Sequence, residues 1–324
     1  MLVSEYNEIM LQVKNLNLGF NCEDGFKQAL FDVSFDLQKG KMLALVGESG
    51  CGKTMSAMSI LNLLPKTARI VSGEIKYNNE NLLERNQKDL QKIRGAKIAL
   101  IPQDPMTSLN PLYTVGDQLL EVIKIHQNIN GEEAYQKAIE ALKTVQIPCP
   151  EIRMNSYPHE FSGGMKQRAI IAMALACNAE ILIADEPTTA LDVTIQAQIM
   201  KLLQEIKNKN NTAILLITHD LALVSENSDE IAVMYAGRIV EKAPTKTFFQ
   251  TPNHPYSIAL LNALPSQNLE KLETIEGQPP SIHQSINGCK FYPRCKHCMD
   301  ICTKEVPQLK AIGADHFSAC WLNN

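Results

Sequence analysis

A chain of 324 residues with 45% hydrophobic and 20% charged residues has the composition of an ordinary globular protein, enough for one large domain with an appendage or for two modest domains. Its net charge of −4 gives no reason to expect a nucleic-acid partner, which would favour a basic face. Its apolar runs have the length of strands rather than membrane spans, and residues 1–13 lack the cationic segment of a secretory signal, so we expect a cytosolic protein.

The first part of the chain, residues 11–46, is predicted to be rich in β-structure and to end in the apolar strand 42–46. A glycine-rich turn follows, and then a helix from about Lys53 to Leu64, which Pro65 ends. A further buried strand is predicted at residues 97–101.

The middle of the chain, about residues 107–157, has a helical pattern. One predicted helical face carries the apolar residues Ala134, Ala138, Ala141, Leu142 and Val145. Three later apolar runs, separated by helix-like segments, predict buried strands at residues 181–184, 213–218 and 231–235. This alternation is typical of an α/β fold with a parallel sheet covered on both faces, here interrupted by a helical insert. After about Tyr256 the periodicity ends, and Pro, Cys and turn residues dominate.

Residues 47–54 fit the phosphate-binding pattern G-x-x-x-x-G-K-[ST] and lie between a predicted strand and a predicted helix, where that chemistry needs them. Glycines let backbone N–H groups surround the phosphates, and the helix N-terminus adds partial positive charge. We expect Lys53 to reach the β- and γ-phosphates and the Thr54 hydroxyl to bind Mg²⁺. A ligand-free glycine-rich turn is the alternative, but it does not account for the whole pattern. The predicted nucleotide-binding residues of this loop are Gly47, Glu48, Ser49, Gly50, Cys51, Gly52, Lys53 and Thr54.

The predicted strand at residues 181–184 leads directly into Asp185 and Glu186. Asp185 is placed to hold Mg²⁺, and Glu186 to polarise an attacking water as a general base. Either carboxylate alone could instead be the N-cap of the next helix. The pair, in a chain with a phosphate loop, favours nucleotide hydrolysis.

Further motifs give residues 10–260 a resemblance to the ATP-binding cassette (ABC) ATPases. Residues 161–168, FSGGMKQR, resemble the signature motif, with Phe161 in place of Leu and Met165 in place of Gln. Gln103 resembles the Q-loop glutamine, residues 190–192 the D-loop, and His219 the switch histidine, although a lone histidine is more often a core residue. The resemblance implies the P-loop ABC ATPase fold, with a β-rich N-terminal subdomain and a helical insert.

The same resemblance implies a role for each of these site residues. Glu186, His219 and Gln103 would act in catalysis, and Thr54, Gln103 and Asp185 would bind Mg²⁺. Ser162, Gly163 and Gly164 would open a second anion-binding helix, which serves the ATP of a partner cassette in a head-to-tail sandwich.

An aromatic side chain ahead of the phosphate loop is expected to stack on adenine. Phe20 is the predicted residue, and Phe26 is its rival because residues 21–25 could be a loop insertion. Either ring could instead be a strand or core aromatic.

The tail extends the resemblance to the ATPases of oligopeptide and dipeptide importers, through residues 253–256 (NHPY), 288–295 (GCKFYPRC) and 299–302 (MDIC). We therefore predict a cassette at 10–260 and a Cys-rich extension at 261–324. The resemblance implies peptide import at the cytoplasmic face of the inner membrane, with a second ATPase subunit, two permease subunits and an extracytoplasmic solute-binding protein. Nickel importer ATPases are the nearest alternative. A soluble cassette ATPase acting on DNA or ribosomes is a further alternative, but such proteins usually carry two fused cassettes, long coiled coils or zinc insertions, whereas this chain has one cassette and no heptad tract. A P-loop kinase would leave the signature and switch motifs without a role.

Nine cysteines are present, and five of them lie in the tail. In a cytosolic protein such a cluster indicates a metal site rather than disulfides. Because some importers that the tail resembles carry an iron–sulfur cluster, we predict a [4Fe–4S] cluster held by Cys289, Cys295, Cys302 and Cys320. Zinc held by Cys295 and Cys298, with His297 as a further ligand, is the rival, and free buried cysteines are the third possibility.

Overall fold

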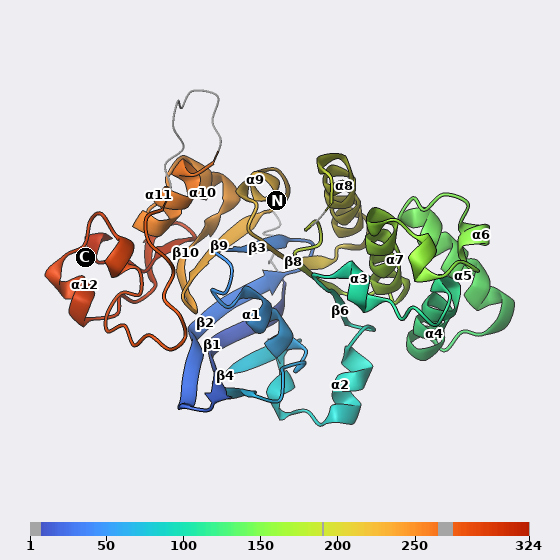
Figure 1. Ribbon diagram of the computed structural model, residues 1–324, viewed down its shortest axis with the longest axis horizontal. Coiled ribbons are helices and arrows are strands. Elements are labelled where there is room, and N and C mark those ends of the chain that lie inside the picture. Colours follow the sequence, from blue (N-terminus) through green and yellow to red (C-terminus); the bar gives the residue numbers. More distant parts are fainter. Residues whose placement is uncertain (1–7, 190, 265–274, 324) are drawn as a thin grey trace, which may run out of the picture. The chain divides into compact units, whose positions relative to one another are not determined.

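The computed structural model describes residues 8–189, 191–264 and 275–323 (Figure 1). It forms two compact units. Unit 1 takes the described residues of 1–38, 42–83 and 217–324, and unit 2 those of 39–41 and 84–216. In the described ranges, no helix combines the length and the apolar character that a bilayer crossing requires.

Unit 1 begins with an antiparallel sheet in the order β2-β1-β4-β5. Its strands are β1 (Ile9–Cys22), β2 (Gly25–Gln38), β4 (Ala68–Tyr77) and β5 (Glu80–Asn81). The predicted β-rich start is therefore confirmed. The segment 21–25 is not a loop insertion but a tight hairpin, in which Asn21 pairs with Phe26 and Cys22 with Gly25.

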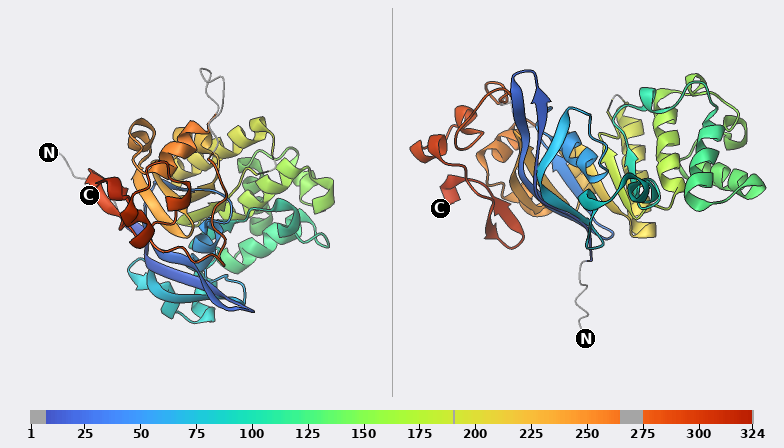
Figure 2. Two further views of the ribbon diagram at one scale, coloured as in Figure 1. Left: turned by 60° about the vertical axis from the view of Figure 1, so that its left-hand side comes forward. Right: turned by 90° about the horizontal axis from the view of Figure 1, so that it is seen from below.

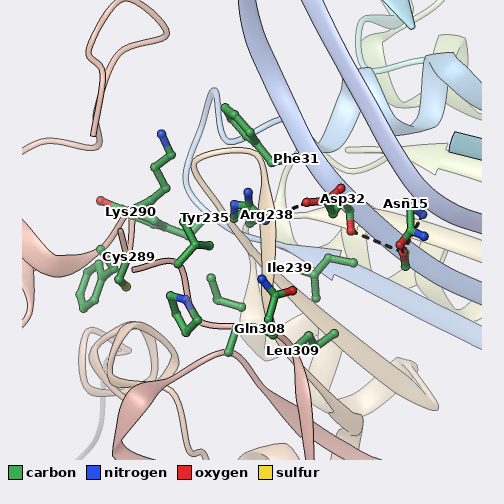
Figure 3. Close-up of a pocket in the computed structure, with 16 residues that line it drawn as sticks. Asn15, Phe31, Asp32, Tyr235, Arg238, Ile239, Cys289, Lys290, Gln308 and Leu309 are labelled. Carbon is green, nitrogen blue, oxygen red and sulfur yellow. Dashed lines mark hydrogen bonds and ion pairs between the residues drawn. The ribbon is translucent and has the colours of Figure 1, made fainter. Parts of the chain in front are cut away.

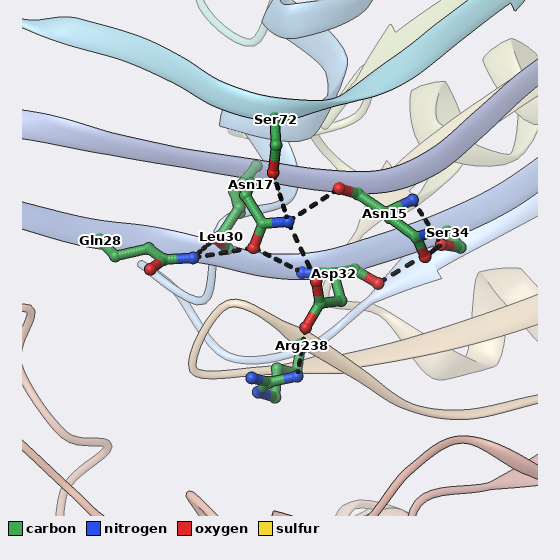
Figure 4. Close-up of polar contacts among 8 residues, drawn as sticks. All are labelled: Asn15, Asn17, Gln28, Leu30, Asp32, Ser34, Ser72 and Arg238. Atoms are coloured by element: carbon green, nitrogen blue, oxygen red, sulfur yellow. Dashed lines mark hydrogen bonds and ion pairs between the residues drawn. The ribbon is translucent and has the colours of Figure 1, made fainter.

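A polar network joins three strands of this sheet where their register shifts (Figure 4). The Asn17 amide nitrogen donates to Asp32 Oδ1 at 3.0 Å and to Ser72 Oγ at 3.1 Å, and its oxygen accepts from Gln28 Nε2 at 2.8 Å. Asp32 has a left-handed backbone with φ 52°, which a non-glycine residue rarely adopts. The network stabilises this turn of the backbone and fixes the Asp32 carboxylate, which also pairs with Arg238 at 3.3 Å.

A second sheet region of unit 1 has the strand order β11-β12-β10-β9-β3. β3 (Met42–Val46) and β9 (Glu230–Tyr235) are parallel, whereas β10 (Arg238–Pro244), β12 (His316–Ser318) and β11 (Lys310–Gly313) join in antiparallel pairs. Both predicted strands, 42–46 and 231–235, are confirmed. Their apolar side chains form a buried cluster that includes Phe248, Tyr256 and Phe291 of the C-terminal part.

The helices of unit 1 are short. They are α1 (Lys53–Ile60), α9 (Leu221–Asn227), α10 (Thr245–Gln250), α11 (Pro255–Asn262) and α12 (Asp300–Lys304), with 3₁₀ turns at Leu82–Glu84, Tyr292–Arg294 and Trp321–Asn323. The predicted extent of the first helix, to Leu64, is wrong. Asn62 turns left-handed with φ 50°, and the Leu63 N–H bonds to the Met58 carbonyl, a Schellman motif that ends the helix before Pro65.

The tail contributes two strands that its sequence did not predict. β12 pairs with β10, and β11 pairs with β12. In both views of Figure 2 the red C-terminal segment lies beside the orange strands of unit 1. Strands of three and four residues are too short to show a periodic pattern, and the partner β10 lies more than 70 residues earlier. The tail therefore packs on unit 1, and Phe291 joins the core cluster.

Unit 2 contains a parallel strand pair and most of the helices. β6 (Ile98–Ile101) pairs with β7 (Ile181–Asp185). The helices are α2 (Gln87–Ile93), α3 (Pro105–Ser108), α4 (Val115–Gln127), α5 (Gly131–Thr144), α6 (Pro150–Arg153), α7 (Gly163–Ala176) and α8 (Val193–Asn210), with a 3₁₀ turn at Pro158–Glu160. β8 (Ala213–Thr218) begins in unit 2 and ends in unit 1.

The helical insert has the predicted apolar face. Ala134, Ala138, Leu142 and Val145 are fully buried, and Ala141 is half-buried. A Thr114–Asp117 capping box starts α4, and left-handed Asn128 ends it. The parallel pairs β3–β9 and β6–β7, together with these helices, confirm the α/β fold class.

Candidate ATP site and cysteine-rich tail

The phosphate loop lies in unit 1 between β3 and α1, and its glycines cannot be replaced without strain. Gly47 has φ 152°, and a Cβ there would lie 2.1 Å from the Met234 carbonyl oxygen. Gly52 has φ 109°, and a Cβ there would meet Leu30 at 2.5 Å. Only glycine fits both the backbone conformation and the space. The turn is therefore built for a backbone path that other residues do not allow.

Lys53 lies within the curve of this loop. Its side chain is only 4% exposed, and its ammonium group donates to the carbonyls of Gly47 at 2.8 Å and Glu48 at 3.1 Å. The Cys51 carbonyl accepts from the Gly237 N–H at 2.9 Å, which ties the loop to the β9–β10 turn. Burial raises the pKa of the Cys51 thiol, so this side chain is a neutral packing group.

Two contacts of Glu48 were not predicted from the sequence. Its carboxylate forms a bidentate ion pair with Arg294 of the tail, with N–O distances of 2.7 and 3.0 Å. Its backbone N–H donates to the Tyr256 hydroxyl at 3.0 Å. The tail motifs that contain Tyr256 and Arg294 were the available signal, but a sequence motif does not say which distant residue it contacts.

The motif at residues 253–256 has a clear structural role. The buried Glu241 carboxylate accepts from the backbone N–H groups of Asn253 at 2.9 Å and His254 at 2.8 Å. His254 then caps α11, since its Nδ1 accepts from the Tyr256 N–H at 3.1 Å. Burial lowers the pKa of His254 to about 3, so the ring is neutral at ordinary pH. The motif thereby fixes the helix that carries Tyr256.

The two adjacent carboxylates belong to unit 2. Asp185 is the buried last residue of β7, and Glu186 follows with a left-handed φ of 47°. Glu186 Oε2 accepts from Gln103 Nε2 at 3.0 Å and from Thr189 Oγ1 at 2.8 Å. Thr189 was not a predicted site residue. The N-cap alternative for the carboxylates is wrong, because Asp192 caps the next helix, α8.

The predicted anion-binding helix is present in unit 2. Ser162 is the N-cap of α7, and its hydroxyl accepts from the Met165 N–H at 3.3 Å. Ser162 and Gly163 are exposed, so the helix N-terminus is accessible to an external anion. Of the predicted D-loop, Ala190 lies outside the described residues.

The remaining predicted catalytic residues divide between the units. Lys53, Thr54 and His219 belong to unit 1, while Gln103, Ser162, Asp185 and Glu186 belong to unit 2. His219 is exposed just before Asp220, the N-cap of α9, so it is not a core histidine. The oxygen donors of Thr54, Gln103 and Asp185 are those that Mg²⁺ prefers.

The predicted adenine-stacking residues lie on the first hairpin. Phe20 is half-buried on β1 and pairs with Lys27 of β2. Phe26 is 44% exposed, and the Arg69 guanidinium lies 5.9 Å from its ring centre. Adenine stacking by Phe20 stays a prediction.

Four of the tail cysteines line one small cavity of about 10 Å³: Cys289, Cys295, Cys302 and Cys320. They are the four predicted cluster ligands. Cys298 is exposed and does not line the cavity, whereas His297 does. Burial raises the pKa of the Cys289 thiol to about 11 and raises those of Cys295 and Cys320. All nine cysteines are free, and within the described part of the chain no three His, Cys, Asp or Glu side chains are arranged to hold a metal ion.

A larger cavity of about 250 Å³ lies beside Cys289 in unit 1 (Figure 3). Two cations share one ring there: the Arg238 guanidinium lies 5.1 Å and the Lys290 ammonium 4.8 Å from the centre of Phe31. Burial and the charge of Arg238 lower the pKa of Lys290. The sequence did not predict this cavity, because its residues come from β1, β2, β9, β10 and the tail.

Comparisons with known proteins agree with this geometry. Residues 30–189 match the family described as ABC transporter, and residues 240–302 match the oligopeptide/dipeptide transporter C-terminal region. The chain is 48% identical to a probable peptide ABC transporter ATP-binding protein of Sinorhizobium fredii, over 98% of this chain and 96% of that protein. It is 46% identical to the oligopeptide transport ATP-binding protein OppD of Escherichia coli (99% and 95% covered) and to the dipeptide transport ATP-binding protein DppD of Bacillus subtilis (98% and 96%).

Solved structures agree with the fold. A dimeric ATP-binding cassette in a post-hydrolysis state, bound to ADP and Pi, is 28% identical with a TM-score of 0.66, over 73% of this chain and 99% of that one. Motif order, the α/β fold and relatives matched over nearly their whole length all agree. The chain therefore belongs to the ATP-hydrolysing, ATP-binding proteins of the oligopeptide and dipeptide ABC transporter family.

Proposed function

We propose that residues 47–54 bind the phosphates of MgATP and that this site powers the import of di- or oligopeptides. The observation that carries the proposal is the loop itself. Its carbonyl groups bind the Lys53 ammonium, and its backbone at Gly47 and Gly52 has no room for a side chain. The loop N–H groups and Lys53 would bind the phosphates, and Thr54 and Asp185 would hold Mg²⁺, with Gln103 as a further ligand. Mg²⁺, when bound, neutralises charge on the phosphates.

Hydrolysis needs a base, and Glu186 is the proposed one. Gln103 and Thr189 both donate to one of its carboxylate oxygens, which orients the side chain for its proposed role of accepting a proton from water. His219 is proposed to approach the γ-phosphate, and Phe20 to stack on adenine. The exposed helix N-terminus at Ser162, Gly163 and Gly164 supports binding the ATP of a partner cassette, identical or different.

A transporter partner for the helical insert is the second part of the proposal. Segment 105–113, just after Gln103, exposes three large apolar side chains: Met106 is 60%, Leu112 79% and Tyr113 56% exposed. Apolar side chains gathered at the surface are typical of a protein interface. We assign this surface to a cytoplasmic helix of a permease subunit, one of two such subunits in the complex at the inner membrane. A solute-binding protein on the far side would deliver the peptide, and the dimeric partner would be a second ATPase subunit.

Two measurements on the native cell test the proposed permease partners and the proposed peptide substrate. A tagged chain is recovered from membranes of its native cell, and the proteins bound to it are identified by mass spectrometry. In a strain lacking the chain, uptake of labelled di- and oligopeptides and of Ni²⁺ is then measured with and without the gene. We expect permease subunits in the recovered complex and restored peptide uptake. Restored Ni²⁺ uptake with no peptide uptake would replace the peptide proposal with the nickel alternative.

The cysteine tail is proposed to bind an iron–sulfur cluster through Cys289, Cys295, Cys302 and Cys320. Support comes from the donor set, since four thiols line one cavity and such clusters are held by cysteine thiolates. The cavity of about 10 Å³ is small, so the thiols have to move apart around a cluster. Zinc through Cys295 and Cys298 has less support, because Cys298 lies outside the cavity.

Anaerobic purification with absorption spectroscopy and metal analysis tests this assignment. We expect a brown protein that contains iron and sulfide. The colour and the iron should be lost in Cys302→Ser and kept in the matched control Cys298→Ser. A colourless protein with stoichiometric zinc would overturn the cluster, and a folded protein without metal would overturn both metals.

A further inference from the structure

The ion pair between Glu48 and Arg294 joins the phosphate loop to the tail. Arg294 Nη1 lies 2.7 Å from Glu48 Oε2, and Nη2 lies 3.0 Å from Oε1. The Arg294 side chain is 5% exposed and that of Glu48 26%, so water screens this pair poorly. A bidentate guanidinium–carboxylate contact fixes orientation as well as distance. The two side chains therefore hold each other in one geometry.

Arg294 is itself anchored on several sides. Its Nε donates to the Glu276 carbonyl at 2.9 Å, and Nη1 also donates to the Tyr235 hydroxyl at 3.3 Å. Its guanidinium lies 5.8 Å from the centre of the Tyr235 ring. Contact with Glu48 raises the pKa of the guanidinium, so its charge is permanent. The tail thus presents a fixed cation to the loop.

Glu48 is held at three groups: its carboxylate, its backbone N–H and its backbone carbonyl. Arg294 holds its carboxylate, the Tyr256 hydroxyl accepts from its N–H at 3.0 Å, and its carbonyl accepts from the Lys53 ammonium at 3.1 Å. A movement of Glu48 would therefore shift both the loop backbone and the lysine. Tyr256 and Tyr235 also touch each other and Phe291 through their rings, with centres 4.6 to 5.3 Å apart.

We propose that Arg294 is a positioning residue of the ATP site: through Glu48 it holds residues 47–54 in the shape that binds phosphate, so that the tail sets the affinity for ATP. This inference rests on the proposed role of residues 47–54 in ATP binding. Arg294 acts through Glu48 and makes no contact with the nucleotide. ATP affinity, rather than the hydrolysis step at saturating ATP, is the quantity that the tail controls.

The test uses the full-length chain and its transporter complex. Arg294→Met removes the charge and keeps the apolar stem, and Lys304→Met removes an exposed charge from the same tail as a matched control. We expect Arg294→Met to raise the Kd and KM for ATP about tenfold, while kcat at saturating ATP stays within about twofold. Lys304→Met should behave like the parent. Arg294→Lys should recover part of the affinity, because it restores the charge but not the bidentate geometry.

A double-mutant cycle separates positioning from mere folding of the tail. Glu48→Gln changes no residue of the tail, breaks the same ion pair from the side of the loop, and should weaken ATP binding in the same direction as Arg294→Met. If the two act as a pair, adding Arg294→Met to Glu48→Gln changes the Kd little further. Fully additive losses would overturn the proposal. If Arg294→Met does not fold, parental ATP affinity in Glu48→Gln would overturn it instead.

Lys53→Ala keeps this inference distinct from the proposed function. If Lys53→Ala binds ATP like the parent, the role of the phosphate loop itself is wrong. If Lys53→Ala loses ATP binding while folded Arg294→Met keeps the parental Kd, the loop is the ATP site and Arg294 does not position it.

Discussion

At the scale of single residues, Glu186 combines a strained backbone with a fixed carboxylate. Its φ of 47° is rare outside glycine, and such strain is concentrated at functional sites. The two donors Gln103 and Thr189 orient its side chain. The chain therefore holds the Glu186 carboxylate on a backbone conformation that most non-glycine residues avoid, as expected of a group that must face a reacting atom.

Glu186→Gln should lower ATP turnover at least about 100-fold while ATP still binds, because the amide keeps the shape but cannot take a proton. ATP-bound dimers should then accumulate. Steady-state hydrolysis and light scattering measure the two effects, with Glu205→Gln on the exposed face of α8 as control. Parental turnover in Glu186→Gln would exclude it as the principal base.

His254 makes the stability of unit 1 depend on pH. The folded ring has a pKa of about 3 and the unfolded one an ordinary value near 6.5, so below about pH 6.5 only the unfolded chain takes up this proton. Lower pH therefore favours unfolding. Between pH 7 and pH 5 this group alone should remove about 2 kcal/mol from the free energy of unfolding.

The variant His254→Asn keeps an N-cap acceptor and cannot titrate in this range. Denaturant unfolding at pH 7 and pH 5 should show a smaller loss of stability in the variant than in the parent. Equal losses in both proteins would contradict the assigned burial of a neutral ring.

At the scale of elements, the packing of α5 controls the stability of the helical insert. Leu142 is fully buried on the face that Ala134 and Ala138 share. Leu142→Ala should reduce the free energy of unfolding by about 2–5 kcal/mol, because it removes apolar contacts and leaves a cavity. The neighbouring Glu140→Ala, on the exposed face, should change it by less than about 0.5 kcal/mol. Chemical denaturation followed by circular dichroism compares them, and equal effects would disprove the packing argument.

At the scale of the whole molecule, the proposed permease surface predicts how the chain fractionates in the cell. Expressed alone, the chain should fractionate with soluble proteins, and expressed with its permease it should fractionate with membranes. Leu112→Asp, in the exposed apolar segment after Gln103, should abolish the shift while ATP binding is kept. Val71→Asp, at an exposed apolar residue of β4, is the control. Soluble behaviour of the parent in both conditions would count against the importer.

The sequence predicted what depends on local patterns. Buried strands such as 42–46 and 213–218 and the turn at Gly47 follow from neighbouring residues, so the sequence predicted them, and the family resemblance placed the start of a helix at Ser162. Contacts between distant segments were not. The contact between Glu48 and Arg294 joins residues 246 positions apart, and the pairing of β12 with β10 also joins segments that are distant in the sequence. The end of α1 was misplaced because left-handed Asn62 stops the helix before the proline does.

The short strand β12 has a consequence for handling the protein. Without it, β10 would present unpaired N–H and C=O groups along part of its length, a template on which other chains can aggregate. In the intact chain the edge strand of the sheet is β11 instead of β10. It has only four residues, is largely exposed and carries Lys310, and these features discourage such association. Shortened versions of the chain that end before residue 310 are therefore expected to self-associate through β10, even where their ATP site is intact. A shortened cassette designed for expression should therefore keep the last fifteen residues or cover the exposed edge of β10 in another way.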